Sequence, residues 1–449
     1  MKLRIAERDW LSLCERLFVR KDVETAGLLL AEAVGSGETG TLVVKQVVVL
    51  DDSAYRIRKR DQISLDPIAL NRLTRVARDR GWSVFTIHTH PGASEPWFSG
   101  ADDAGDERFM PALKCQIPNA THGSIVVVES RSAIARTFDE HGTSQEVPLV
   151  VVGRTLESTL PASARSAEWF ARQELALGAR GQAQLRALRV GIVGLGGTGS
   201  LVALQLAHLG VGALVLVDAD KIEASNLSRV VGASKADIGE TFKVDVAARY
   251  ARSVGLVGSI ESRREALGST NAHVLGACDI VVSCVDRHTP RSVLNRLAYR
   301  YLVPTIDLGT AFRVDERGTM TGNAGRVVVV GPGRPCLACW GHLDPHALRI
   351  EALSKAERSE QERLGYIDGA EEPQPSVIAF NAAVASAAVT ELLRMATGFA
   401  GAEKPPLRLA FDFAEGTVRR NSLAANSACG ICGDGSAAAE SATPLLASA

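Results

Sequence analysis

The stretch RVGIVGLGGTG, residues 189–199, decides the fold of the larger part of this chain. An apolar run ends at Val193 and is followed by four glycines: Gly194, Gly196, Gly197 and Gly199. Glycines let a backbone turn tightly and approach a phosphate, and the N-terminus of the helix that follows supplies free N–H groups and positive potential. The stretch therefore predicts a nucleotide-binding turn between a strand and a helix.

Further apolar runs place this turn in an α/β domain. They cover residues 190–193, 214–217, 280–285 and 303–306. Near-continuous apolar strands that alternate with helices are typical of a parallel sheet covered on both faces, so we expect a doubly wound, Rossmann-like fold. Asp218 follows the second run, where a carboxylate can accept hydrogen bonds from ribose hydroxyls. These features alone fit an NAD-dependent oxidoreductase equally well.

Polar residues downstream of the glycine turn favour ATP. They are Asp218, Asp220, Asn226, Arg229, Lys243 and Asp286, with Arg291 and Asn295 beyond. Nucleotidyl transfer needs cations and a metal-binding carboxylate around the phosphates, because charge develops on the α-phosphate and on the leaving pyrophosphate. In this order the set resembles the ThiF/MoeB family, which includes ubiquitin-activating enzymes, over about residues 166 to 435.

The resemblance implies a role for each matching residue. It assigns Asp218, with Asp220 beside it, to the ribose, and Asn226, Arg229 and Lys243 to the phosphates. Asp286 would bind Mg²⁺. Residues 169–173 are similar to the family's N-terminal helix, so Arg172 would reach the γ-phosphate bound by the partner subunit of a homodimer. Gly239 precedes Lys243 by one residue more than in the family pattern.

Four of the eight cysteines form two Cys-x-x-Cys pairs, Cys336 with Cys339 and Cys429 with Cys432. Glycine and proline beside each pair favour the tight turns that a tetrahedral Zn²⁺ site needs. A redox function would explain one pair and not two. The pairs therefore predict a closed structural zinc site, which also matches the ThiF/MoeB pattern and contributes to folding.

Activating enzymes that form thioesters usually carry another cysteine after the first zinc pair, but residues 340–376 contain none. Cys14, Cys115, Cys278 and Cys284 lie elsewhere, and buried cysteines of this kind usually serve packing. We therefore expect adenylation without an internal thioester. The acyl adenylate would pass to sulfur, to a cysteine of a separate conjugating enzyme, or to another nucleophile.

The first 150 residues mix strands and helices. Strands are expected at residues 41–50, 83–88 and 124–128, and a helix is expected from Pro67, capped by Asp66, to Gly81. A linker is expected at residues 151–166, an activating domain at 167–435 and a disordered tail at 436–449.

A histidine motif in the first region predicts a metal site. His88 and His90 alternate at the end of a strand, so both side chains point to one side, and Asp102 follows as a carboxylate ligand. The fourth zinc position would hold water, whose pKa the metal lowers. Upstream, Glu24 could take a proton from that water and pass it to the leaving amine.

The order Glu … His-x-His-Pro … Ser-x-x-Asp resembles the JAB/MPN (JAMM) metalloproteases, which implies an α+β, cytidine-deaminase-like domain. The resemblance assigns His88, His90 and Asp102 to zinc, Glu24 as the general base and Ser99 as the stabiliser of the oxyanion. The loop from His90 to Ser99 is one residue longer than usual, so Asp103 competes for the third position, although the Ser-x-x-Asp pattern selects Asp102. The alternative is a surface His-x-His beside unrelated acids, or an inactive copy of the fold.

The bulk composition excludes other classes. A formal charge of −1 in 449 residues argues against a nucleic-acid or membrane-surface protein. Acidic and basic residues interrupt the first ten positions, which argues against a signal peptide. The apolar run at 377–396 contains Asn381 and Glu391, which favours a buried soluble helix. We expect a cytoplasmic protein.

Together the two resemblances imply a bifunctional enzyme that acts on a ubiquitin-like protein. One half would cleave the amide after the partner's C-terminal tail, and the other would adenylate that terminus with ATP. Such fusions suit a bacterial ubiquitin-like conjugation system, for example in antiviral defence. The alternatives are a sulfur-carrier enzyme of small-metabolite biosynthesis, a non-catalytic scaffold that binds the ubiquitin-like partner, and the NAD-dependent oxidoreductase.

Overall fold

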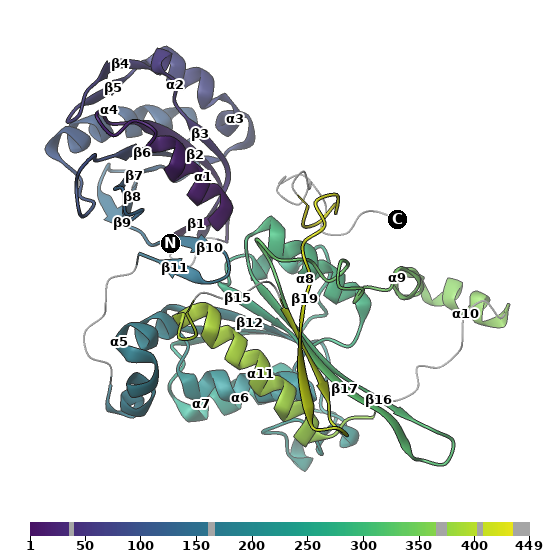
Figure 1. Cartoon of the computed structure of the whole chain (residues 1–449). Helices are drawn as coiled ribbons and strands as arrows, with labels where there is room; N and C mark the ends of the chain where they lie inside the picture. The colour runs from purple at the N-terminus through teal and green to yellow at the C-terminus, as the bar shows by residue number, and fades with distance from the viewer. Residues whose placement is uncertain (36–39, 160–166, 365–374, 402–406, 434–449) are drawn as a thin grey trace. The chain divides into compact units, whose positions relative to one another are not determined.

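The computed structural model describes residues 1–35, 40–159, 167–364, 375–401 and 407–433. The chain divides into two compact units whose main segments are Met1–Pro161 and Ala162–Ala438. Figure 1 labels the helices and strands of both. The predicted tail, residues 436–449, lies outside the described residues.

The first unit is built on a mixed sheet. Its described strands have the order β11 (Leu156–Ser158), β10 (Leu149–Val152), β1 (Lys2–Ala6), β3 (Thr41–Val49), β2 (Ala26–Val34), β6 (Ser83–Thr89), β7 (Gly123–Val127), β8 (Ala133–Phe138) and β9 (Ser144–Glu146). The pairs β10–β1, β1–β3 and β6–β7 are parallel, and the others are antiparallel. A separate hairpin pairs β4 (Tyr55–Arg58) with β5 (Ile63–Leu65).

Helices cover both faces of this sheet because its central strands are apolar on both faces. In β2, Leu29 and Ala31 belong to one buried cluster with residues of α1 (Glu7–Leu17), whereas Leu28 and Leu30 belong to the opposite cluster. Alternate residues of a strand face opposite sides, so one strand contributes to both cores. The second cluster includes side chains of α2 (Pro67–Leu73), α3 (Arg75–Arg80) and α4 (Gly100–Gln116).

Two local predictions in this region need correction. The expected helix after Pro67 is broken at Thr74, whose hydroxyl donates to the carbonyl oxygen of Leu70 at 2.9 Å, and Asp66 makes no side-chain cap. The expected linker is wrong at its beginning, because β10 and β11 pair with each other and extend the sheet as far as Ser158. Within the described residues, Glu157 and Ser158 of the expected linker lie in the short edge strand β11.

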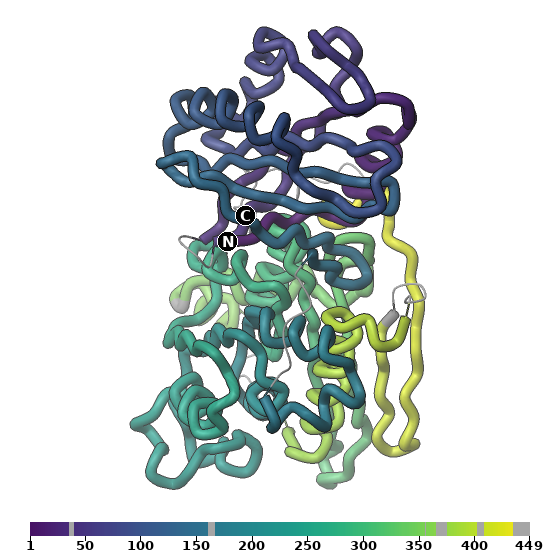
Figure 2. Tube along the Cα trace, turned by 90° about the vertical axis from the view of Figure 1, so that its left-hand side faces the viewer, coloured from purple at the N-terminus to yellow at the C-terminus, as the bar shows by residue number. Residues whose placement is uncertain are grey.

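The second unit contains a sheet with a parallel half and an antiparallel half. The described order is β14 (Ser259–Arg263), β13 (Ala213–Val217), β12 (Arg189–Val193), β15 (Ile280–Ser283), β16 (Thr305–Val314), β17 (Met320–Val330), β18 (Leu407–Asp412) and β19 (Thr417–Ser422). Strands β14 to β16 are parallel. The strands from β16 to β19 form antiparallel pairs, and the β18–β19 arm is conspicuous in Figure 2.

Strand β12 is the topological switch point of the parallel half. The chain leaves it through α6 (Gly197–Leu209) towards β13 on one side, and β15 pairs with it on the other. In open α/β sheets, ligands bind beyond the carboxyl ends of the strands at such a point. The glycine turn after Val193 lies there.

The remaining helices of the second unit are α5 (Ala171–Ala187), α7 (Lys243–Val254), α8 (His288–Arg300), α9 (Pro345–Ala352), α10 (Lys355–Arg363) and α11 (Ile378–Thr397). By length and composition, α11 could span a membrane. In this fold it packs along α6 and against β16, and both Asn381 and Glu391 are buried (Figure 1). This packing agrees with the predicted buried helix.

Candidate functional site

The glycine turn at the end of β12 has little room for side chains except on one side. Gly194 has a φ of +85°, and a Cβ there would lie 2.7 Å from the carbonyl oxygen of Cys284, after the neighbouring β15. A Cβ at Gly199 would overlap the carbonyl oxygen of Gly194. At Gly196, by contrast, no described atom lies within 4 Å of that position. The open side therefore lies at the start of α6, where a phosphate would meet the helix N-terminus.

This geometry makes a prediction for Gly199→Ala. In a helix such a change ordinarily stabilises by up to about 1 kcal/mol. Here the added methyl group would overlap backbone, so we expect lower stability and weaker ATP affinity, measured by thermal melting and calorimetric titration. Gly105→Ala in α4, where a Cβ has open space, is the matched control. Unchanged ATP affinity in the Gly199 variant would contradict the turn geometry.

Asp218 is tied to the glycine turn by backbone hydrogen bonds. Its carboxylate accepts from the N–H of Leu195 at 2.6 Å and from that of Asp220 at 2.8 Å. Burial raises the pKa of Asp218, and these hydrogen bonds and Lys243 oppose the rise. The carboxylate thus stands at the carboxyl edge of β13, beside the turn.

Cationic groups lie on the same edge. The Lys243 ammonium is 2.7 Å from the carboxylate of Asp220. A Cβ at Gly197 would lie 3.2 Å from Cδ of Arg229, which places this arginine beside the turn, and its guanidinium donates to the carbonyl oxygen of Ser225 at 2.7 Å. Asn226 is buried, and its side-chain oxygen accepts from the N–H of Glu223 at 3.1 Å.

Asp286 lies exposed between β15 and α8, next to the glycine turn in the sheet. Arg291 and Asp307 hold the loop that carries Asp286 in place. The Arg291 guanidinium donates to the carbonyl oxygen of Val285 at 2.6 Å and to the buried Asp307 at 2.9 Å, and Asp307 also pairs with Arg326 at 2.8 Å. Arg291 is therefore a buried support of the loop.

Arg172 is exposed in the first turn of α5, and its predicted role needs a second copy of the chain. Asn381 of α11, which the sequence analysis treated only as a polar residue of a buried helix, touches the turn: a Cβ at Gly197 would overlap its side-chain amide. No sequence motif links residue 381 to residue 197, so only the packing of α11 on α6 reveals this contact.

Comparison with known proteins agrees with this arrangement. The family model described as "ThiF family" matches residues 170–431, more than half of the 449 residues. The chain belongs to the ThiF family. ATP is the nucleotide that this family implies for the glycine turn. The matched range lies within the second unit, and this family model does not cover the first unit.

Relatives of this ThiF-family chain include a protein named adenylyltransferase and sulfurtransferase uba4, from Aspergillus fumigatus, which is 36% identical over 239 residues. That match covers 52% of this chain and 48% of the relative. The SAMP-activating enzyme E1 of Haloferax volcanii is 32% identical over 164 residues, covering 36% of this chain and 57% of the relative. The chain spans about half the length of the curated relatives it matches. Among solved structures, E. coli MccB with ATP is 21% identical, with a TM-score of 0.47, over 60% of this chain and 75% of that chain.

The four cysteines of the ThiF unit lie together as predicted. The Sγ atoms of Cys336 and Cys429 are 3.7 Å apart, those of Cys339 and Cys432 are 3.6 Å apart, and all four lie within 4.8 Å of one another. A tetrahedral site with Zn–S bonds of about 2.3 Å requires sulfur separations of about 3.8 Å. The cluster therefore fits a structural zinc ion.

The histidine motif of the first unit forms a second cluster. The Nε2 atoms of His88 and His90 are 3.2 Å apart. One carboxylate oxygen of Asp102 lies 2.9 Å from Nε2 of His88, and the other lies 3.5 Å from Nε2 of His90. Zn–N bonds of about 2.0–2.1 Å in tetrahedral geometry give an N–N separation of about 3.3 Å. Burial opposes ionisation, but contacts with His88, His90 and Ser99 hold the pKa of Asp102 well below its usual range. The donor set fits a zinc ion.

Ser99 has a role that the sequence analysis did not foresee. Its side chain caps α4: the hydroxyl donates to Asp102 at 2.7 Å and accepts from the Asp102 N–H at 3.2 Å. The Asp102 carboxylate also accepts the N–H of Ser99 at 2.6 Å. This capping box fixes the third ligand beside the histidines. The predicted contact of Ser99 with an oxyanion stays a prediction.

Glu24 lies buried just before β2, within electrostatic reach of the cluster. Burial raises its pKa to about 7, and the nearby His88 and His90 oppose the rise. A carboxyl group with a pKa near neutrality can both accept and return a proton. Trp97, missed by sequence reasoning because it lies in no motif, packs against His90 in a T-shaped arrangement at a centroid distance of 4.8 Å and is about half exposed.

Proposed function

We propose that the second unit uses ATP to adenylate the C-terminal carboxylate of a small ubiquitin-like or sulfur-carrier protein. The observation that carries this proposal is the glycine turn at the sheet's switch point, with Asp218, Lys243 and Arg229 around it, in a chain of the ThiF family. The names of its relatives, an adenylyltransferase and sulfurtransferase and a SAMP-activating enzyme, support the same class of reaction.

In the proposed reaction, a terminal carboxylate oxygen of the carrier attacks the α-phosphorus of ATP. The bond from that phosphorus to the pyrophosphate oxygen breaks, which gives an acyl adenylate and pyrophosphate. Asp218 holds the ribose, and Arg229, Lys243 and the N-terminus of α6 face the phosphates. Asp286 would hold Mg²⁺, which would supply charge neutralisation on the leaving group.

We favour a sulfur nucleophile for the next step. Residues 340–376 contain no cysteine, so the usual internal thiol is missing after the zinc pair. Its place would be taken by a persulfide on a separate sulfur-donor protein, whose terminal sulfur attacks the adenylate carbonyl and displaces AMP. Later reductive cleavage of the acyl disulfide by a thiol would leave a thiocarboxylate on the carrier. Conjugation through a separate cysteine enzyme is the alternative.

Intact mass spectrometry tests this proposal. The full chain is incubated with ATP, Mg²⁺ and each of a panel of small ubiquitin-like proteins, followed by a persulfide donor. A carrier that gains the mass of AMP, and then exchanges a terminal oxygen for sulfur, supports sulfur transfer. A thioester to an added conjugating enzyme would support the alternative. If the chain neither binds ATP with Mg²⁺ nor exchanges pyrophosphate with any carrier, adenylation is excluded.

The first unit supports a second candidate function, a zinc-dependent cleavage of an amide bond after the carrier's tail. The observation that favours it is the convergence of His88, His90 and Asp102 beside the buried carboxyl group of Glu24. A zinc ion there would supply Lewis-acid activation of water and of the scissile carbonyl. Glu24 takes a proton from the attacking water and returns it to the leaving amine nitrogen. Ser99 and Asp102 hold each other in place.

Glu24→Gln tests the peptidase. The amide cannot accept the proton, so hydrolysis of a tail peptide should fall by about 10²- to 10⁴-fold, measured as kcat at saturating peptide. Zinc content should stay unchanged, because Glu24 is not one of the three clustered residues that could hold the metal, His88, His90 and Asp102. Glu32→Gln, within the strand β2 that follows Glu24, is the control. Hydrolysis at the original rate in the Glu24 variant would remove Glu24 from the mechanism.

A further inference from the structure

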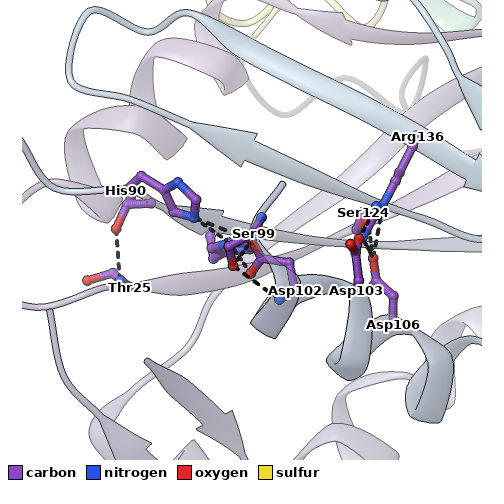
Figure 3. A network of polar contacts seen from close by, with 10 residues as sticks. Thr25, His90, Ser99, Asp102, Asp103, Asp106, Ser124 and Arg136 are labelled. Carbon is purple, nitrogen blue, oxygen red and sulfur yellow. Dashed lines mark hydrogen bonds and ion pairs between the residues drawn. The ribbon is translucent and has the colours of Figure 1, made fainter. Parts of the chain in front are cut away.

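Two neighbouring aspartates at the start of α4 point in different directions. Asp102 contacts both histidines, whereas the carboxylate of Asp103 is 2.6 Å from the guanidinium of Arg136 (Figure 3). Successive residues of a helix are about 100° apart around its axis. Either carboxylate could therefore be the third ligand, depending on how α4 is rotated about its axis.

Arg136 fixes the rotation of α4 through contacts with α4 itself, with β7 and with the loop before α4. Its guanidinium pairs with Asp106, one turn further along α4, at 2.7 Å, and donates to the hydroxyl of Ser124 in β7 at 3.1 Å. The Ser124 hydroxyl in turn donates to Asp106 at 2.5 Å. Arg136 itself is in β8, and its guanidinium lies 3.8 Å from the ring centroid of Phe98, in the loop before α4. Helix, loop and sheet therefore meet at one guanidinium.

The part of the network formed by Arg136, Asp106 and Ser124 is buried, which makes it difficult to rearrange, whereas Asp103 is exposed. Arg136, Asp106 and Ser124 are each less than 9% exposed. Removing one partner of a buried ion pair leaves the other charge without compensation, which is strongly unfavourable. Asp103 and Asp106, three residues apart, lie on the same side of α4 and are both held by Arg136. A rotation that brought Asp103 to the histidines would break both pairs.

We propose that Arg136 is a positioning residue that selects Asp102 over Asp103 as the third metal ligand of the first unit. It acts through the orientation of α4 and does not touch the metal-binding atoms. The capping box of Ser99 fixes the Asp102 side chain, and Arg136 fixes the helix on which it stands. This inference rests on the proposed zinc site, but it requires no hydrolytic activity.

Zinc affinity of the full chain tests the proposal, measured by competition with a chelator. In Arg136→Met, the affinity of the histidine site should fall by about 10- to 100-fold, as when an outer-shell partner of a metal ligand is lost. The four-cysteine site, to which Arg136 contributes nothing, is the internal reference. Lys21→Met, which removes an exposed ion pair with Glu129 from the same unit, is the matched control and should leave both sites unchanged.

Asp103→Asn and Asp102→Asn keep the test decisive if Arg136→Met does not fold. Asp103→Asn should still bind zinc at the histidine site, because Arg136 still pairs with Asp106. Asp102→Asn should no longer bind zinc there. In Arg136→Met/Asp103→Asn, part of the affinity should return, since the competing carboxylate is gone. The absorption spectrum of the Co²⁺-loaded protein should change shape in Arg136→Met and not in Lys21→Met, because the spectrum reports ligand geometry.

The outcomes separate the two proposals. Loss of the histidine site in Asp103→Asn, or unchanged zinc affinity in a folded Arg136→Met, overturns the role of Arg136. Zinc that binds as predicted in every variant, in a protein that cleaves no tail peptide, leaves that role intact and contradicts only the peptidase. A wild-type chain that binds zinc at the four cysteines alone removes both.

Discussion

Replacing Cys336 with serine is expected to lower the melting temperature of the second unit by about 10 °C or more, because a structural zinc site contributes directly to folding. Cys336 is fully buried, and its segment is held by α8: Asn295 accepts the N–H of Leu337 at 2.8 Å, and the Tyr299 hydroxyl donates to the carbonyl oxygen of Arg334 at 2.9 Å. Loss of the metal would free this segment and expose the apolar cluster beneath it.

That apolar cluster contains Ala298, Val328, Val330 and Leu337. Differential scanning calorimetry should therefore show a lower transition for the second unit in Cys336→Ser, together with the loss of one zinc equivalent. A chelator should produce the same shift in the wild type. Cys115→Ser, at an exposed position of α4, should change neither quantity. An unchanged transition temperature after one zinc equivalent is lost would show that the four-cysteine zinc site is dispensable for folding.

Asp286→Asn is expected to reduce ATP–pyrophosphate exchange by about a thousandfold, the upper range for removing one group that stabilises transition-state charge. The carboxylate stands exposed at the carboxyl edge of β15, one strand from the glycine turn, and the amide would lack the charge proposed to bind Mg²⁺. The affinity for adenosine, which carries no phosphate, should remain. Arg291 and Asp307, which support the loop, are untouched by the substitution.

Asp315→Asn is the matched control for this experiment. Asp315 is exposed in the turn between β16 and β17, where its side-chain oxygen accepts the N–H of Thr319 at 2.8 Å, and asparagine can accept the same bond. Exchange in this variant should equal that of the wild type. If Asp286→Asn also exchanges at the original rate, Mg²⁺ is held by another group and the assignment of Asp286 is wrong.

Local spacing predicted much of this protein. The glycine turn, the two Cys-x-x-Cys pairs and the His-x-His-Pro motif each place their key atoms within a few residues, where backbone geometry alone sets the separation. The family match confirmed the nucleotide fold, and the cysteines cluster as expected. The strand at 303–306 was too short, because β16 continues to Val314 by pairing with β17, a contact made only after the chain has turned.

The sequence by itself therefore determined the chemistry available to the chain: a glycine turn suited to a phosphate, two sets of side chains that fit a metal ion, and a family. Only the tertiary structure shows which side chains from elsewhere in the chain support that chemistry. The Ser-x-x-Asp pattern selects Asp102, and the structure adds that Arg136, thirty-three residues after Asp103, holds the helix on which Asp102 stands. Asn381 touches the glycine turn because α11 packs on α6. Such contacts join side chains that are distant in sequence and adjacent in space, so no local pattern can encode them.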